Sequence, residues 1–99
     1  MEILEVAIKS LSKLTNLGSG LNHPLDKSRA QELFKALYKE GIPLNYSEVR
    51  SLAIKYNWPT DHAEKLAKLA EKIGAGGRVV IKHPSGWGER IVEQIKAQH

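Results

Sequence analysis

Residues 49–66, VRSLAIKYNWPTDHAEKL, predict two helices that meet at a sharp turn. A helix-turn-helix needs a small residue where its helices cross and, four residues later, a residue that tolerates left-handed backbone. Apolar positions then follow on the second helix. Ala53, Asn57, Ala63 and Leu66 supply these residue types at that spacing. The pair therefore resembles a helix-turn-helix, although any two helices that cross at a tight turn give a similar pattern.

Prolines and glycines divide the rest of the chain into further helices. Each proline stands just ahead of a helical pattern, and glycines follow several of the patterns, as helix starts and left-handed helix ends favour. The expected helices cover about 2–16, 26–40, 45–56, 60–73 and 86–97. Their expected N-caps are Asp26, Asn45, Thr60 and either Ser85 or Gly86. Residues 78–82, RVVIK, form one short β-like stretch.

These elements predict a mostly α, compact single domain over residues 1–99. An amphipathic N-terminal helix occupies 1–17, and the helical core occupies 26–97. A chain of this length buries about 65% of its unfolded surface, which is enough for a core without covalent staples. Tyr38 and Trp87 fall at helical spacing with apolar residues, so we expect both to face inward.

The composition excludes several classes of protein. The chain has no cysteine, which excludes disulfides, thiolate metal sites and a thiol nucleophile. The longest apolar runs are three residues, so we expect neither a membrane span nor a signal-peptide core. Because the absence of cysteine suits a reducing compartment, we expect a cytoplasmic protein that has no membrane partner.

No arrangement of residues predicts catalysis, a cofactor or a metal site. His23, His62, His83 and His99 lack metal-ligand spacing, and we expect them to be exposed or to cap helices. The glycine-rich run at 74–77 follows a helix and precedes the β-like stretch, which is the opposite order to a phosphate-binding loop. We therefore predict that the protein is not an enzyme.

The formal net charge of +4 points toward an anionic partner. If the central pair binds nucleic acid, residues 60–73 form the reading helix. The basic side chains that would then contact phosphates are Arg50, Lys55, Lys65, Lys68, Lys72, Arg78 and Lys82.

The charges of the expected reading helix also have an explanation without a ligand. Residues 59–74 carry three basic and three acidic side chains. Asp61 and Glu64 each stand four residues before a lysine, a spacing that forms ion pairs along a helix. The same two carboxylates would repel phosphates near the bases, and the segment has no Arg, Asn or Gln for base contacts.

The leading hypothesis is an accessory or regulatory module that contacts a protein partner or self-associates. It would act through the amphipathic first helix or through a corner formed by Lys82, His83 and Trp87. Trp87 has a structural alternative, in which it fills the core and its flanking glycines allow close packing. The alternative function is a weak DNA- or RNA-binding protein of helix-turn-helix or winged-helix type, with short strands at 42–44 and 78–82.

The later part of the chain resembles a known family. Its segments NWPT at 57–60, GGRVVIK at 76–82 and PSGWGE at 84–89 are similar to the YoaC-like family of small uncharacterised enterobacterial cytoplasmic proteins. The resemblance covers about the last 50 residues. It implies a compact, mostly helical single domain, and it implies no catalytic or binding residues.

Overall fold

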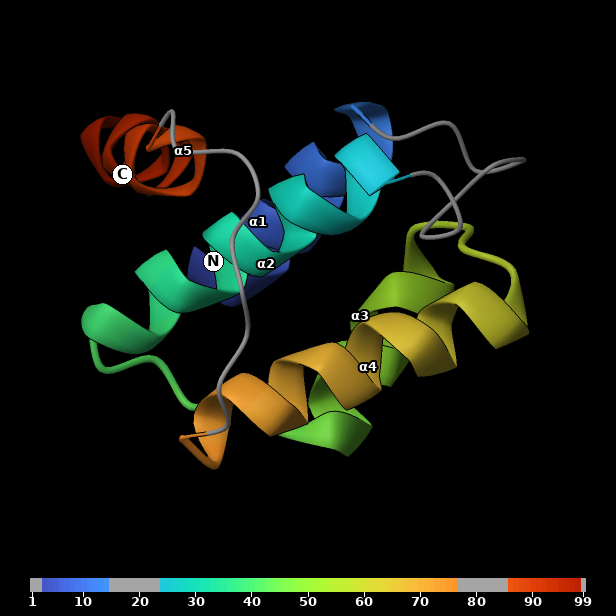
Figure 1. The fold of residues 1–99 in the computed structure, drawn as a ribbon. Helices are drawn as coiled ribbons and strands as arrows, with labels where there is room; N and C mark the ends of the chain where they lie inside the picture. Colours follow the sequence, from blue (N-terminus) through green and yellow to red (C-terminus); the bar gives the residue numbers. More distant parts are fainter. Residues whose placement is uncertain (1–2, 15–23, 77–85, 99) are drawn as a thin grey trace.

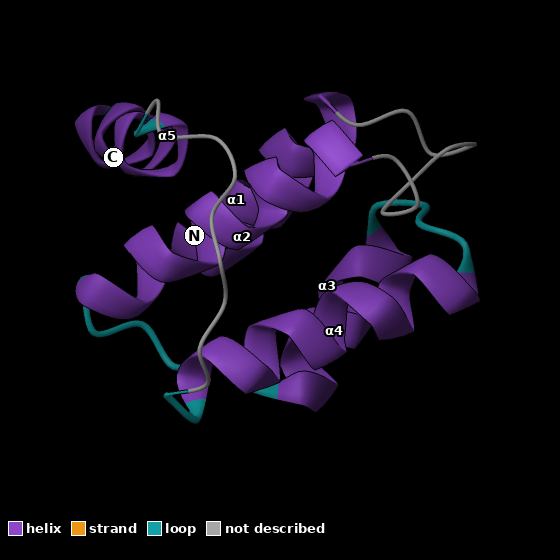
Figure 2. Cartoon of the chain, in the orientation of Figure 1, coloured by secondary structure: helices purple, strands orange, loops and turns teal. Residues whose placement is uncertain are grey.

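A computed structural model describes residues 3–14, 24–76 and 86–98, and these ranges contain five α-helices (Figure 1). The helices are α1 (Ile3–Leu14), α2 (Pro24–Lys39), α3 (Tyr46–Lys55), α4 (Thr60–Gly74) and α5 (Trp87–Ala97). Figure 2 shows helices and connecting loops in these ranges, with no strand. The predicted helical class is confirmed, whereas the β-like stretch expected at 78–82 lies outside the described residues.

The helices form two layers. Figure 1 shows α1, α2 and α5 on one side and the α3–α4 pair on the other. Helix α2 packs against α5 in its own layer and against α4 in the other layer, and α1 packs against α3. Two helix–helix contacts therefore join the layers, and α4 packs against both α3 and α2.

The hydrophobic core lies between the layers and uses the apolar face of α1. Leu4, Ala7, Ile8 and Leu11 of that helix are all buried. They meet the most buried side chains of α2, which include Leu33, Phe34 and Leu37. Burying side chains of this size stabilises a fold by about 1.5–3 kcal/mol each. The expectation that this face of the first helix serves as a partner surface is therefore wrong.

The turn between α3 and α4 has the backbone expected from the sequence. Asn57 has a φ of 70°, in the left-handed region that asparagine tolerates better than most residues. Ala53 and Ala63, on either side of the turn, are fully buried. Their small side chains let the two helices approach closely, and Trp58 packs beneath the turn with 3% of its surface exposed.

Two predicted N-cap positions, Asn45 and Gly86, are confirmed, and two are wrong. The Asn45 side chain accepts hydrogen bonds from the backbone amides of Ser47 and Glu48, at 2.9 and 3.4 Å. Thr60 is instead the first residue of α4, because Pro59 occupies the cap position in an extended conformation. Asp26 lies within the first turn of α2, since that helix already begins at Pro24 and proline suits the first helical position.

Two side-chain expectations are also corrected. Tyr38 is 48% exposed, because it stands one residue beyond Leu37 and hence about 100° around the helix from the buried face. His62 is only 6% exposed, because it lies one turn before Leu66 on the inward side of α4. Within the described ranges no helix is long and apolar enough to cross a membrane.

Candidate binding surfaces

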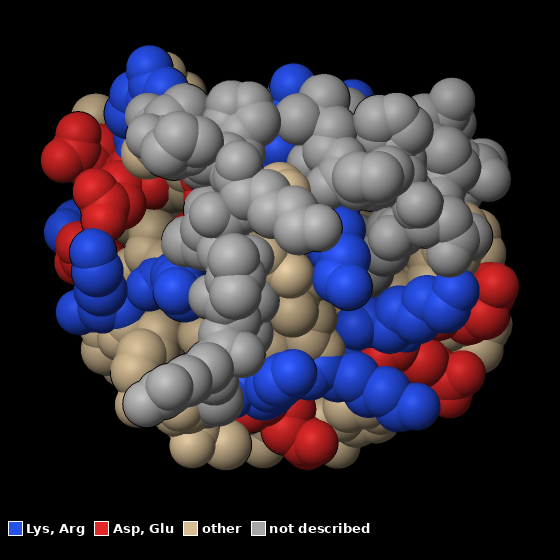
Figure 3. All heavy atoms as spheres, in the orientation of Figure 1, with Lys and Arg blue, Asp and Glu red and all other residues tan. Residues whose placement is uncertain are grey.

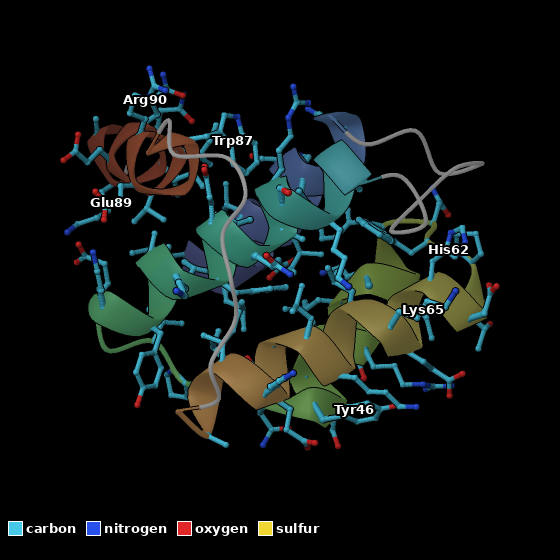
Figure 4. All side chains as sticks on the ribbon, viewed as in Figure 1. Tyr46, His62, Lys65, Trp87, Glu89 and Arg90 are labelled. Carbon is cyan, nitrogen blue, oxygen red and sulfur yellow. The ribbon has the colours of Figure 1, made fainter. Side chains whose placement is uncertain are left out.

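Three lysines form a row along the outer face of α4. Lys65, Lys68 and Lys72 are all exposed, and their spacing of three and four residues places them on one side of the helix. The row extends about 10 Å along the helix axis. Figure 3 shows basic side chains interspersed with acidic ones along α4, and Figure 4 labels Lys65 on that helix. We call Lys65, Lys68 and Lys72 the lysine row.

The acidic side chains of α4 are only partly engaged with the lysine row. Glu64 Oε2 lies 3.6 Å from Arg50 Nε on α3, so this carboxylate pairs across the helical hairpin and does not pair with Lys68. Asp61 Oδ2 lies 3.9 Å from His62 Nε2. Within the described ranges, neither Lys68 nor Lys72 lies within 4 Å of a carboxylate. Two of the three lysines therefore stand outside the ion pairs of the described residues, although the exposed Glu71 lies on the same stretch of helix.

Lys55 on α3 forms an ion pair with Glu5 on α1. Its Nζ lies 2.5 Å from Glu5 Oε1, and the Tyr56 hydroxyl donates to the same oxygen at 2.9 Å. The hydrogen bonds from Lys55 and then Tyr56 hold the pKa of the Glu5 carboxyl below its usual value. The hydrogen bond to Glu5 in turn raises the pKa of Lys55. This cluster ties α1 to α3, so Lys55 has a structural partner.

The seven basic residues predicted to contact phosphates therefore divide into three groups. Lys65, Lys68 and Lys72 share one face of α4, and Arg50 borders that face through Glu64. Lys55 belongs to the contact with α1. Arg78 and Lys82 lie outside the described residues.

The corner expected around Trp87 has a packed and an exposed part. Trp87 begins α5, is half-buried against the core, and has the Arg29 guanidinium 5.9 Å from its ring centroid (Figure 4). The next residue, Gly88, touches α2: a Cβ there would lie 2.3 Å from the backbone of Glu32. The Gly88 amide donates to Glu32 Oε2 at 3.2 Å. Trp87 thus packs where α5 meets α2, while Lys82 and His83 lie outside the described residues.

A shallow hollow between α2 and α5 is crossed by ion pairs. It has a volume of about 150 Å³ and is lined by Ala36, Lys39, Glu40, Glu89, Val92 and Glu93. Lys39 Nζ lies 2.7 Å from Glu89 Oε1, and Lys96 Nζ lies 2.8 Å from Glu40 Oε2. The hydrogen bond from Lys39 lowers the pKa of Glu89. Two of the three carboxylates at the hollow are thus engaged in exposed ion pairs.

The described ranges contain no group of three or more histidine, aspartate and glutamate side chains that could hold a metal ion. In the same ranges Glu5, Glu64 and Glu89 contact lysine, arginine or tyrosine side chains, and Glu32 accepts from a backbone amide.

A family model described as a domain of unknown function, DUF1889, matches residues 1–96. The chain belongs to this family. The resemblance expected over the last 50 residues is therefore confirmed, and the match extends over the N-terminal helix as well.

Two bacterial relatives and one solved structure support the DUF1889 assignment. The chain is 30% identical over 73 residues to the uncharacterized protein YoaC of Escherichia coli K12 and to that of Shigella flexneri, covering 74% of each chain. It is also similar to a crystal structure from Salmonella typhimurium, with a TM-score of 0.81 and 27% identity. That likeness covers 98% of this chain and 96% of the other. The similarity to the crystal structure supports the fold, and the names of the relatives give no ligand.

Some contacts in this DUF1889 chain had no signal in the sequence. Glu5 and Glu32 contact Tyr56 and Gly88 from other helices. These pairs are separated by more than 50 residues, so helical periodicity carries no information about them. Gly88 is different, because a glycine inside a helical pattern indicates close packing.

Proposed function

We propose that this DUF1889 protein is a non-enzymatic accessory or regulatory module that docks onto an anionic partner through the lysine row of α4. The observation that supports this function best is the exposure of Lys65, Lys68 and Lys72 on a single helix face. Clustered like charges attract a partner of opposite sign and speed its association. The absence of cysteine fits a partner in the cytoplasm.

The packing of α4 supports this role because it makes the surface rigid. The inward face of the helix buries Ala63, Leu66, Ala67, Ala70 and Ile73. The left-handed Asn57 and the small Ala53 bring α3 against its side, as in a helix-turn-helix. Charged side chains on a fixed helix lose less entropy on binding than those on a mobile loop.

A second surface is favoured by the pairing of Trp87 with Arg29. Tryptophan and arginine are the residue types that dominate the binding energy of protein interfaces. A protein partner, or a second copy of the chain, would use this α2–α5 corner in place of α4. The second function therefore differs from the first in the surface that a partner covers.

Elution from immobilised heparin, a sulfated polyanion, tests the docking surface. The triple variant Lys65→Ala, Lys68→Ala, Lys72→Ala should elute at clearly lower salt than the wild type, because three neighbouring charges are lost. The charge-matched control replaces the exposed Lys9, Lys13 and Lys27 of α1 and α2 by alanine. Both variants have the same net charge, so their difference measures the position of the charges.

Equal elution of the two triple variants would show that net charge alone acts, and would contradict the proposal. Arg29→Ala is a further control, and it should elute close to the wild type. A larger effect of Arg29→Ala than of the α4 triple variant would move the contact to the Trp87 corner.

A further inference from the structure

We infer that the anionic partner of the lysine row is the sugar–phosphate backbone of duplex nucleic acid, contacted without reading the base sequence. This inference rests on the proposed docking function and names the chemical class of the partner. It is carried by the residue types, spacing and surroundings of α4.

The residue types on the row favour phosphates over a protein surface. Lysine is depleted in protein interfaces, whose centres need apolar or aromatic anchors. Among the described residues, the large apolar side chains that are exposed are Tyr38 on α2 and Ile54 on α3. The outer face of α4 thus offers charge without an apolar anchor, which is the chemistry of a phosphate contact.

The length of the lysine row fits consecutive phosphates. Lys65 and Lys72 are seven residues apart, or about 10 Å along the helix. One strand of a duplex presents a phosphate every 3.4 Å or so along its axis. Along the strand itself neighbouring phosphates are roughly 7 Å apart, so the flexible side chains of three lysines over this length can reach two or three successive phosphates if α4 lies along the backbone.

The N-terminal end of α4 excludes base reading. Helices that read bases present their N-terminal residues to the base edges. In α4 this end carries Asp61, whose side chain is 73% exposed and whose Oδ2 lies 3.9 Å from His62 Nε2. The helix also contains no Arg, Asn or Gln for bidentate base contacts. We expect α4 to touch the backbone with its lysine half and to leave Asp61 outside the groove.

The acidic residues near the row do not prevent this contact. Glu64 pairs with Arg50 on α3, at 3.6 Å, which reduces its repulsion of phosphates. Lys68 and Lys72 lie farther along the helix, beyond that pair. Lys68 and Lys72 are therefore the lysines of the row most distant from Asp61, and the exposed Glu71 is the acidic residue that stands beside them in the sequence.

A salt-dependent titration of fluorescently labelled duplex DNA tests the inference. Two duplexes of equal length and unrelated sequence are titrated with the full chain at 50 and 200 mM salt. Three phosphate contacts predict a log–log slope of about −2.7, which is roughly a 40-fold loss of affinity over this range. The two duplexes should bind within about threefold of each other, because backbone contacts carry no sequence information.

Variants of the lysine row test whether binding requires the positive charge of these side chains. Replacing Lys65, Lys68 and Lys72 by glutamine should remove about 2.7 from the magnitude of the slope, whereas replacing them by arginine should keep it. The glutamine triple at Lys9, Lys13 and Lys27 is the control and should leave the slope near the wild-type value. Circular dichroism of each variant confirms that the helices remain folded.

Poly-glutamate as a competitor distinguishes the failure of the inference from the failure of the proposed function. If poly-glutamate binds through the lysine row and duplex DNA does not, the anionic docking function stands and the nucleic-acid inference is overturned. If one duplex binds more than tenfold tighter than the other, readout is not restricted to the backbone and the inference is also overturned. If neither polymer binds, both proposals are wrong.

Discussion

Gly88 brings the backbone of α5 against the backbone of α2. A methyl group at this position would lie 2.3 Å from the carbonyl carbon and oxygen of Glu32 and 2.5 Å from the amide nitrogen of Leu33. These are backbone atoms, so they cannot move aside as a flexible side chain would. At this residue the packing of two helices depends on the absence of a side chain.

We expect Gly88→Ala to lower the free energy of unfolding by about 1–3 kcal/mol, which is typical of overpacking. The sign is diagnostic, because the same change at an exposed helical position stabilises a protein by up to about 1 kcal/mol. Urea denaturation measures the effect, and Gln94→Ala on the exposed face of α5 is the control, expected within about 0.5 kcal/mol of the wild type. An increase in stability of Gly88→Ala would show that α5 does not lie against α2 as described.

At the scale of the elements, Glu5 makes the contact between α1 and α3 sensitive to pH. Lys55 and Tyr56 both donate to its carboxylate, which holds its pKa below the usual value of 4.5. A group with a lowered pKa in the folded state stabilises the fold above its unfolded pKa, and the contribution is lost as the pH falls through the folded value. Lys55 has a raised pKa, so its contribution is lost only as the pH rises above 10.5.

We therefore expect Glu5→Gln to lose less stability than the wild type between about pH 6 and pH 3. Tyr56→Phe, which removes the second hydrogen bond and keeps the ring, should lie between the two. Thermal unfolding at a series of pH values measures the difference. If all three proteins lose stability in parallel on acidification, the carboxylate of Glu5 does not hold α1 on α3.

The helices themselves were largely predictable from local signals. Asn45 and the turn at Asn57 were recognisable because side-chain capping and left-handed backbone restrict the residue types at single positions. Thr60 was misleading, since Pro59 before it already has the conformation of a cap residue. Tyr38 was placed inward because the apolar pattern of α2 is wide, and only the packed neighbours show which part of it is buried.

At the scale of the whole molecule, no local pattern in the sequence indicated which helix faces are buried by other helices. The apolar face of α1 is equally consistent with a core helix or a partner surface until the fold of α2 and α3 around it is known. The different surroundings of the basic residues were equally unpredictable from local sequence. Lys55 pairs with Glu5, 50 residues away, whereas the lysine row is exposed to solvent. Charge position therefore follows from tertiary structure, although net charge follows from composition.

The account of the molecule as a binding module depends on which face meets the partner. Two-dimensional ¹H–¹⁵N NMR of the labelled chain during titration with a short duplex locates that face most directly. We predict that the amide shifts concentrate on the outer face of α4, around Lys65, Lys68 and Lys72, and disappear as salt is raised. Shifts concentrated around Arg29 and Trp87, with α4 unchanged, would contradict the account.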